Sequence, residues 1–379
     1  MNGGFISPLG VYIHIPFCKS KCKYCAFVSV SDFSLQKKYV DALLGEIKGS
    51  LERGLSVDTV YIGGGTPSCL YRGALNSIFS ALRSAFDVMP DAEITVECNP
   101  ESVSEAFVDE CLKCGVNRIS MGLQSSCDEI LRKIGRVHDF SAFLRAAEML
   151  SHNFSDISSD MILGLPGQTK EDVDRCVEVF SKYCTHASVY ALTVEEGTTL
   201  YKSGYCPDDD FVAELYDYAV SALNCSGFKR YEVSNFARDG KRSKHNGRYW
   251  SLRPYLGFGV AAHGYDGWAK RTRHSDDLYS YIETPTATEI PLSRTDMYNE
   301  YVMLRLRTDD GISFKDFTDR FGFRFEEFNR EKIDNLCACG YIRPSEKGIV
   351  ISPEYMFVMN GIIEELMADD SDFLPDFAI

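Results

Sequence analysis

The sequence predicts an α/β protein: a partial, TIM-like (β/α)6 barrel followed by a smaller winged-helix-like domain. Two observations carry this prediction. Six short β-rich runs alternate with longer segments of helical periodicity, which favours parallel strands joined by right-handed crossovers. The chain then ends in helices followed by a β-hairpin pattern, and its 379 residues are enough for two hydrophobic cores.

The β-rich runs lie at 11–15, 57–63, 93–98, 117–122, 158–164 and 186–192. The helical segments lie at 35–53, 73–86, 104–114, 139–151, 170–183 and 208–226. Eight such units would close a full barrel. Six therefore predict an open barrel over residues 1–240, with a gap that leaves room for a large substrate.

The pattern changes after residue 237. Residues 241–289 are rich in Gly, Arg and Tyr and are interpreted as a basic connector. Helical segments at 294–307, 313–322 and 325–340, two short strands around 345–348 and a last helix predict the winged-helix-like domain over 290–379. Residues 368–379 form an acidic tail that is expected to be loosely held.

Composition and charge limit the classes of function. No run reaches the roughly 18 apolar residues that span a bilayer, and the first residues lack a secretion-signal pattern, so a cytoplasmic protein is expected. The net charge of −15 argues against general affinity for nucleic acid or anionic membrane. Residues 238–273 depart from this, with nine Lys or Arg against two Asp or Glu, and are expected to meet an anionic group.

Three cysteines, Cys18, Cys22 and Cys25, follow the first predicted strand in a C-x3-C-x2-C pattern. A structural zinc site takes four protein ligands, and a catalytic one usually includes His or carboxylate. Three thiolates in one short loop instead suit a [4Fe–4S] cubane whose fourth iron has no protein ligand. A small chelating molecule such as S-adenosylmethionine can bind that iron. A zinc site and unliganded core cysteines are the alternatives.

Other unusual residues also fall at the C-terminal ends of predicted strands, where the loops of a β/α barrel converge. These are "GGGTP" at 63–67, Glu97, Gln124, Asp160 and Tyr190. Glycines allow backbone to approach a zwitterionic ligand closely. The sequence therefore predicts one composite site at this end of the barrel.

Several stretches carry a resemblance to a known family: "YIHIPFCKSKCKYCAF", "YIGGGTPS", "ECNPE", "RISMGLQS", "IGRVH", "DMILGLPGQT" and "YEVSNFA". They resemble radical S-adenosylmethionine enzymes, more narrowly the oxygen-independent coproporphyrinogen oxidases and their relatives, the HemW-type heme chaperones. The resemblance implies a radical S-adenosylmethionine barrel whose cluster is ligated by Cys18, Cys22 and Cys25. By motif position it implies this S-adenosylmethionine site: Tyr12, Tyr24, Gly64, Gly65, Thr66, Glu97, Gln124, Arg136, Asp160 and Ala191.

These side chains suit such a ligand chemically. Arg136 can pair with a carboxylate, Gln124 can bridge by hydrogen bonds, and Glu97 and Asp160 can accept from ribose hydroxyls or offset a sulfonium. Tyr24 can lie against an adenine. The alternatives are a surface helix start for Arg136 and a helix cap or buried pair for Asp160.

Two features separate the subfamilies. The oxidases resemble this chain but carry a fourth cysteine, as C-x3-C-x2-C-x-C, where this sequence has Phe27. "HNGRYW" at 245–250 matches the H-N-x-x-Y-W motif of the chaperones, which implies heme ligation by His245, with Tyr249 and Trp250 as flat apolar surface. The alternative is that His245 and Asn246 cap a turn while Tyr249 and Trp250 join the core. His263 is a second candidate ligand, although a buried structural histidine is preferred.

The resemblance implies a heme chaperone that binds heme, a [4Fe–4S] cluster and S-adenosylmethionine and hands heme to an acceptor protein. An electron donor to the cluster is expected, with membrane contact only through the acceptor. One alternative is an oxygen-independent coproporphyrinogen III oxidase that acts by oxidative decarboxylation. Another is a DNA-binding regulator, which the acidic composition of 290–379 opposes.

Overall fold

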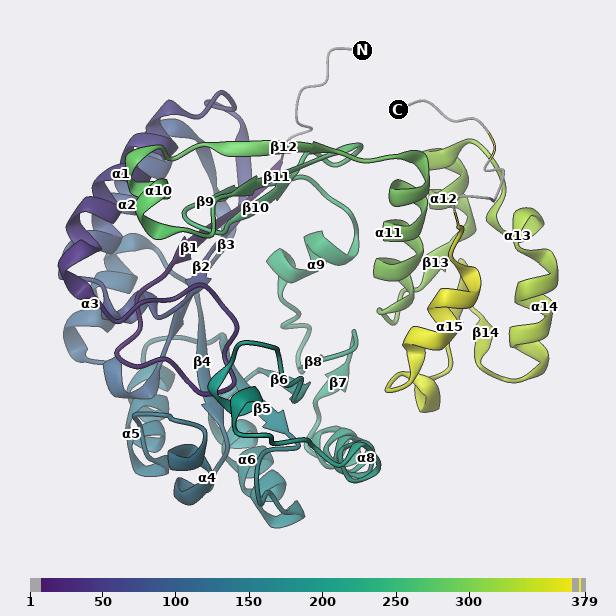
Figure 1. Ribbon diagram of the computed structural model, residues 1–379, viewed down its shortest axis with the longest axis horizontal. Helices are drawn as coiled ribbons and strands as arrows, with labels where there is room; N and C mark the ends of the chain where they lie inside the picture. Colours follow the sequence, from purple (N-terminus) through teal and green to yellow (C-terminus); the bar gives the residue numbers. More distant parts are fainter. Residues whose placement is uncertain (1–7, 370–374, 376–379) are drawn as a thin grey trace.

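The computed structural model describes residues 8–369 and 375. Its large sheet has the strand order β12-β11-β10-β9-β1-β2-β3-β4-β5-β6-β8-β7 and curves into an open barrel (Figure 1). Neighbours from β1 to β6 pair in parallel. These strands are β1 (Leu9–Ile15), β2 (Ser56–Gly64), β3 (Asp87–Cys98), β4 (Arg118–Gln124), β5 (Ile157–Leu163) and β6 (His186–Ala191). The predicted strands and their parallel order are confirmed.

Helices after these strands cover the outer face of the sheet (Figure 1). They are α1 (Gln36–Gly49), α2 (Ala74–Ala85), α3 (Glu105–Cys114), α5 (Phe140–Ser151), α6 (Lys170–Tyr183) and α8 (Asp209–Cys225). Side-chain caps explain several of the starts: Asp139 accepts from the Ala142 N–H, and Thr169 forms a capping box with Asp172. The sequence did not predict the short helices α4 (Asp128–Lys133) and α7 (Thr199–Lys202).

The inner strands place apolar side chains outward and polar side chains inward. Val11 and Ile13 of β1 lie in the hydrophobic core beneath the helices, whereas Tyr12 between them stacks on Tyr61 of β2 inside the barrel. Glu97 of β3 accepts a hydrogen bond from the Tyr61 hydroxyl at 2.6 Å. This alternation follows from the two-residue period of a strand and gives the barrel a polar interior.

The segment 241–289, predicted to be a connector, instead belongs to the large sheet. It forms α9 (Lys244–Trp250), β9 (Tyr255–Phe258), β10 (His263–Tyr265), β11 (Lys270–His274), α10 (Leu278–Glu283) and β12 (Ala287–Pro291). Strand β9 pairs in parallel with β1, and β10 to β12 continue antiparallel. Glycine is needed at 257, because a Cβ there would lie 2.0 Å from the His263 carbonyl oxygen. At the opposite edge lie β7 (Lys229–Arg230) and β8 (Asn235–Ala237).

The C-terminal part has the predicted winged-helix-like layout. Its elements are α11 (Arg294–Leu306), β13 (Ile312–Ser313), α12 (Phe314–Phe321), α13 (Phe325–Phe328), α14 (Arg330–Ala338), β14 (Ile342–Pro344), β15 (Gly348–Ile351) and α15 (Met359–Leu366). The three strands form a sheet of their own, in the order β13-β15-β14. Apart from residues 368, 369 and 375, the predicted acidic tail lies outside the described residues.

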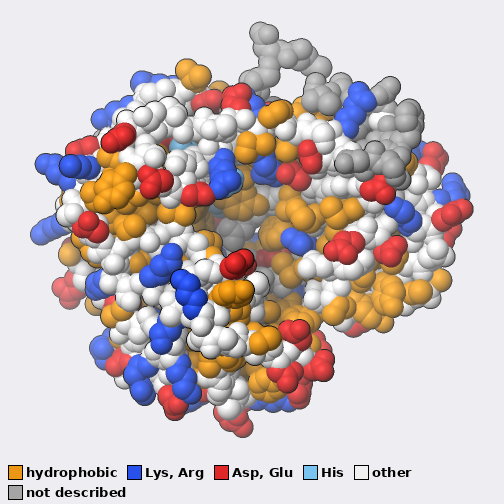
Figure 2. Space-filling model, viewed as in Figure 1, with side chains coloured by type: hydrophobic (Ala, Val, Ile, Leu, Met, Phe, Trp, Pro, Cys, Tyr) orange, Lys and Arg blue, Asp and Glu red, His pale blue; other side chains and the backbone are white. Residues whose placement is uncertain are grey.

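The barrel and the C-terminal part share a second hydrophobic core. Tyr255 and Tyr265 of the large sheet are buried in it together with Tyr298 and Phe317, and the Arg320 guanidinium lies 4.8 Å from the centre of the Trp268 ring. Figure 2, which has the same view as Figure 1, shows a hollow near the middle of the molecule, with hydrophobic side chains around it. Among the described helices, none combines the length and apolar character needed to cross a bilayer.

Candidate functional site

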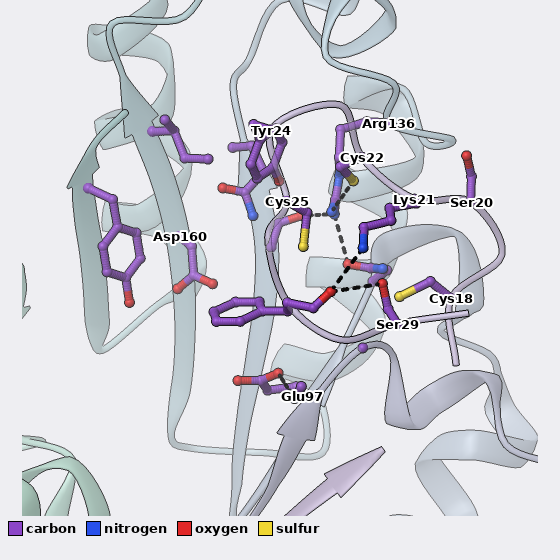
Figure 3. Close-up of a pocket in the computed structure, with 18 of the residues that line it drawn as sticks. Cys18, Ser20, Lys21, Cys22, Tyr24, Cys25, Ser29, Glu97, Arg136 and Asp160 are labelled. Carbon is purple, nitrogen blue, oxygen red and sulfur yellow. Dashed lines mark hydrogen bonds between the residues drawn. The ribbon is translucent and has the colours of Figure 1, made fainter. Parts of the chain in front are cut away.

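A cavity of about 400 Å³ lies at the C-terminal ends of the parallel strands (Figure 3). It collects side chains from β3, β4, β5 and β6 and from the cysteine loop. The predicted residues that line it are Cys18, Cys22, Tyr24, Cys25, Gly64, Gly65, Glu97, Gln124, Arg136, Asp160 and Ala191. The residues singled out at the strand ends therefore line one cavity.

The three cysteines are free thiols on a loop held at both sides. The Cys18 N–H donates to the Val30 carbonyl at 3.0 Å, and the Lys23 N–H donates to the Ile134 carbonyl at 2.9 Å. The Thr66 hydroxyl lies 3.4 Å from the Cys18 sulfur, and an Arg136 nitrogen lies 3.6 Å from the Cys22 sulfur. These donors can stabilise sulfur that carries negative charge.

The thiols do not meet at a single point. Across the described residues, no three His, Cys, Asp or Glu side chains are placed to hold one metal ion. A cubane binds each thiolate at a different iron, and three separate thiols at the edge of an open cavity fit that group.

Burial raises the pKa of the Cys18 and Cys25 thiols. The Lys21 ammonium acts in the opposite direction on the pKa of Cys25. Lys21 and Lys19 donate to the carbonyls of Phe27 and Glu101, so both are held against the protein while they contribute positive charge near the thiols. Metal binding requires the thiolate, and it would offset the cost of burying that charge.

Arg136 is a partly buried cation that lines the cavity rather than a surface helix start. Its Nη2 donates to the Asn99 side-chain oxygen and to the Gly122 carbonyl, both at 2.8 Å. Its Nε is buried and has no partner among the described residues, and the same holds for the Gln124 side-chain oxygen. Such orphaned polar atoms are costly unless a ligand satisfies them. They fit a ligand with carboxylate and amino groups.

Gln124 takes its position through strained backbone. Its φ is 71°, in the left-handed region that favours glycine, and the pairing of β4 with β5 shifts register between Gly122 and Gln124. A Cβ at residue 122 would lie 2.6 Å from the Gln124 amide nitrogen. The strain is located where the chain lines the cavity, which is common at functional sites.

Two carboxyl groups face the cavity with raised pKa values. Glu97 accepts from the Tyr61 hydroxyl and from the Gly64 N–H at 3.0 Å, and burial raises its pKa to about 7. Burial also raises the pKa of Asp160, and a hydrogen bond from Ser188 acts in the opposite direction. The resulting pKa is about 6. Both groups favour a cationic ligand, because a positive charge would stabilise their ionised forms.

Two predicted residues support the cavity without lining it. Thr66 is buried, contacts the Cys18 sulfur and accepts from the Asn99 amide at 2.9 Å. The Tyr12 hydroxyl lies 3.0 Å from the His14 ring nitrogen inside the barrel. Asn99 lines the cavity and joins Arg136 to Thr66. It was not among the predicted residues, although it lies in the quoted "ECNPE" stretch.

His245 does not reach a free surface. Its side chain is buried, with Nδ1 3.0 Å from the Thr59 hydroxyl and Nε2 2.8 Å from the Tyr249 hydroxyl. Its ring stacks on Tyr61, and burial lowers its pKa to about 3. Both ring nitrogens therefore have partners, and neither can bind heme iron in this arrangement. The geometry does not support His245 as a heme ligand. His245 does not cap a turn either, because it is buried within α9, whose N-cap is Ser243, while Tyr249 packs against the second core as the alternative expected.

The basic segment does not present an excess of free charge. Arg248 and Arg253 bind Asp58, and Arg242 binds Asp309. The remaining ion pairs are Lys241–Asp156, Lys270–Glu289, Arg271–Glu300 and Arg273–Asp276. Most partners are distant in sequence, so the local count of charges overestimated the positive field. His263 also differs from the prediction, because it is exposed rather than buried.

Comparisons with known proteins agree with this site. A family model described as the radical SAM superfamily matches residues 12–180, and one described as the HemN C-terminal domain matches 292–358. The heme chaperone HemW of Bacillus subtilis is 32% identical over 380 residues, covering 94% of this chain and 99% of that protein. HemW of Escherichia coli is also 32% identical, covering 96% of this chain and 99% of its own.

The solved structure of coproporphyrinogen III oxidase (HemN) from Escherichia coli, described as a radical SAM enzyme, has the same fold. It matches with a TM-score of 0.83 at 22% identity and covers 96% of this chain and 91% of its own. Identity over nearly the full length is higher with the chaperones. The chain therefore belongs to the radical S-adenosylmethionine superfamily and, within it, to the family of HemW-type heme chaperones.

Proposed function

We propose that the protein is a heme chaperone that carries a [4Fe–4S] cluster and S-adenosylmethionine and transfers heme to an acceptor protein. The proposal rests above all on the cavity with three separate thiols, in a chain that is 32% identical to heme chaperones over 94% of its length. When bound, the cluster and S-adenosylmethionine would supply one-electron chemistry. Cys18, Cys22 and Cys25 would hold the cluster, Arg136 would pair with the ligand's carboxylate, and Glu97 and Asp160 would face its cationic and ribose groups.

A transfer experiment tests the chaperone function. Anaerobically reconstituted protein is loaded with heme and mixed with an apo-hemoprotein, and the two are separated and their absorption spectra recorded. Heme is expected to move to the acceptor faster than it dissociates from the chaperone into buffer. Transfer that only matches the spontaneous dissociation rate would refute the proposal.

Coproporphyrinogen III oxidase is the competing function, since the fold is shared with that enzyme. The position of the oxidases' fourth cysteine is occupied here by Phe27, which is 66% exposed at the cavity. We expect no protoporphyrinogen when reconstituted protein, S-adenosylmethionine and a reductant are incubated with coproporphyrinogen III. Product formation at several turnovers would establish the oxidase instead.

The His245→Ala variant is expected to bind heme as the wild type does while losing stability. The ring is buried between Thr59 and Tyr249, and removing a buried hydrogen-bonded ring costs about 2–4 kcal/mol. Optical heme titration and urea unfolding measure the two effects. A lost or shifted Soret band in a variant that remains folded would show that His245 ligates heme after all.

Affinity for S-adenosylmethionine is expected to fall as the pH is lowered. Glu97 and Asp160 have pKa values of about 7 and about 6, so both become neutral as the pH drops through this window, and their attraction for the sulfonium is lost. By linkage, Kd should rise about tenfold or more from about pH 8 to about pH 5.5. Calorimetric titrations over this range check the effect, and an Asp160→Asn, Glu97→Gln variant should show weak, pH-independent binding.

A further inference from the structure

We propose that Phe27 and Tyr190 form an aromatic platform at the mouth of the cavity, on which the flat face of a tetrapyrrole macrocycle lies. The inference rests on the proposed function and deepens it, because it places the carried ligand next to the cluster site rather than at His245. It also identifies the chemistry of recognition as ring stacking rather than iron ligation.

The first observation is the exposure of these rings. Phe27 is 66% and Tyr190 is 42% exposed. Among the large hydrophobic side chains that are exposed in the described part of the chain, these two line the cavity. Large aromatic side chains are normally mostly buried, and exposed ones at a concave site are typical of ligand contact.

The second observation is that both rings stand on fixed backbone. The Phe27 carbonyl accepts from the Lys21 ammonium at 3.2 Å and from the Ser29 hydroxyl at 3.4 Å. Tyr190 belongs to β6, where it pairs with Ile162 of β5. Ile162 and Leu192 line the same cavity. The two rings and these aliphatic side chains supply apolar surface beside the polar groups of the cavity, such as Asp160.

The third observation concerns the iron of heme. No histidine lines the cavity among the described residues, and its thiols at 18, 22 and 25 are the proposed cluster ligands. A tyrosine hydroxyl such as that of Tyr190 is ordinarily protonated near neutral pH, so the phenolate that would ligate iron is disfavoured. The site can therefore recognise the macrocycle but offers it no strong axial ligand. Lys21, which also lines the cavity, supplies positive charge suited to a propionate.

The test compares heme with metal-free protoporphyrin IX, both titrated into the anaerobically reconstituted full chain. Stacking alone predicts that both ligands bind with similar affinity. Phe27→Ala and Tyr190→Ala are each expected to weaken both by about tenfold, the size of a lost aromatic contact, whereas Phe27→Trp and Tyr190→Phe should retain binding. Tyr279→Ala is the matched control, because Tyr279 is 62% exposed on α10, away from the cavity.

Iron content, measured in each variant, shows whether the cluster loop has kept its fold. Unchanged affinity in the two alanine variants, or binding of heme without binding of the metal-free porphyrin, would overturn the platform while leaving the chaperone function intact. Wild-type protein that binds neither tetrapyrrole would overturn the proposed function and the platform together.

Discussion

The Cys22→Ser variant is expected to lose most of its cluster iron. Cys22 is one of three thiols at separate points of the cavity, and Arg136 lies 3.6 Å from its sulfur. A cubane with only two protein thiolates has two open corners, and a serine hydroxyl is far less acidic than a thiol and does not replace the thiolate well. Iron and sulfide analysis after anaerobic reconstitution, with the absorption and electron paramagnetic resonance spectra, measures the loss.

Cys69→Ser is the matched control for this experiment. Cys69 ends the short helix after "GGGTP" and is partly exposed. Its thiol is close enough to Cys18 for the two charges to interact, and burial is the main reason that its pKa is raised. If the fourth iron is open to a small ligand, Cys69→Ser should keep full iron content and S-adenosylmethionine binding. Loss of iron in this control would mean that a fourth thiol closes the cluster, and the open coordination position would be refuted.

Replacing Arg248 with leucine is expected to destabilise the barrel by about 3–5 kcal/mol, the usual cost of breaking a buried ion pair. The fully buried Arg248 side chain binds Asp58 and donates to the Thr59 hydroxyl at 3.0 Å and to the Pro254 carbonyl at 3.1 Å. These bonds connect α9 to the start of β2 and to the residue just before β9. Urea unfolding followed by circular dichroism under anaerobic conditions measures the change.

Arg253→Ala provides the comparison, because Arg253 binds the same carboxylate at 3.2 Å from a side chain that is 49% exposed. An exposed pair contributes about 1 kcal/mol or less, so this variant should unfold near the wild-type urea concentration. Equal losses in the two variants would show that burial does not distinguish the two arginines. A small loss in Arg248→Leu would show that α9 is held by other contacts.

The six inner strands and their helices could be predicted because their signals are local. A buried strand such as β2 (Ser56–Gly64) and an amphipathic helix such as α6 (Lys170–Tyr183) carry their periodicity within a few residues. Strands β9 to β12 could not be predicted in this way. They are short, β9 pairs with β1 far away in the chain, and Gly257 and Gly264 make the segment similar to a loop in composition.

The cysteine loop and the strand-end residues were predictable because a parallel barrel brings all its strand ends to one face. His245 illustrates the limit of that reasoning. Its motif says which residues are present, but only the fold shows that Thr59 and Tyr249 occupy both ring nitrogens. The basic segment shows the same limit, since the acids that neutralise it, such as Asp58, Asp309 and Glu300, come from other parts of the chain.

The open β/α barrel, the three-thiol loop and about half of the residues that line the cavity could be predicted from the sequence. These follow from short-range periodicity and from the common direction of parallel strands. The folded structure was needed to show which charges are neutralised, which histidine is buried and which aromatic rings remain exposed. Burial and pairing depend on side chains brought together from distant positions, and no local pattern in the chain specifies them.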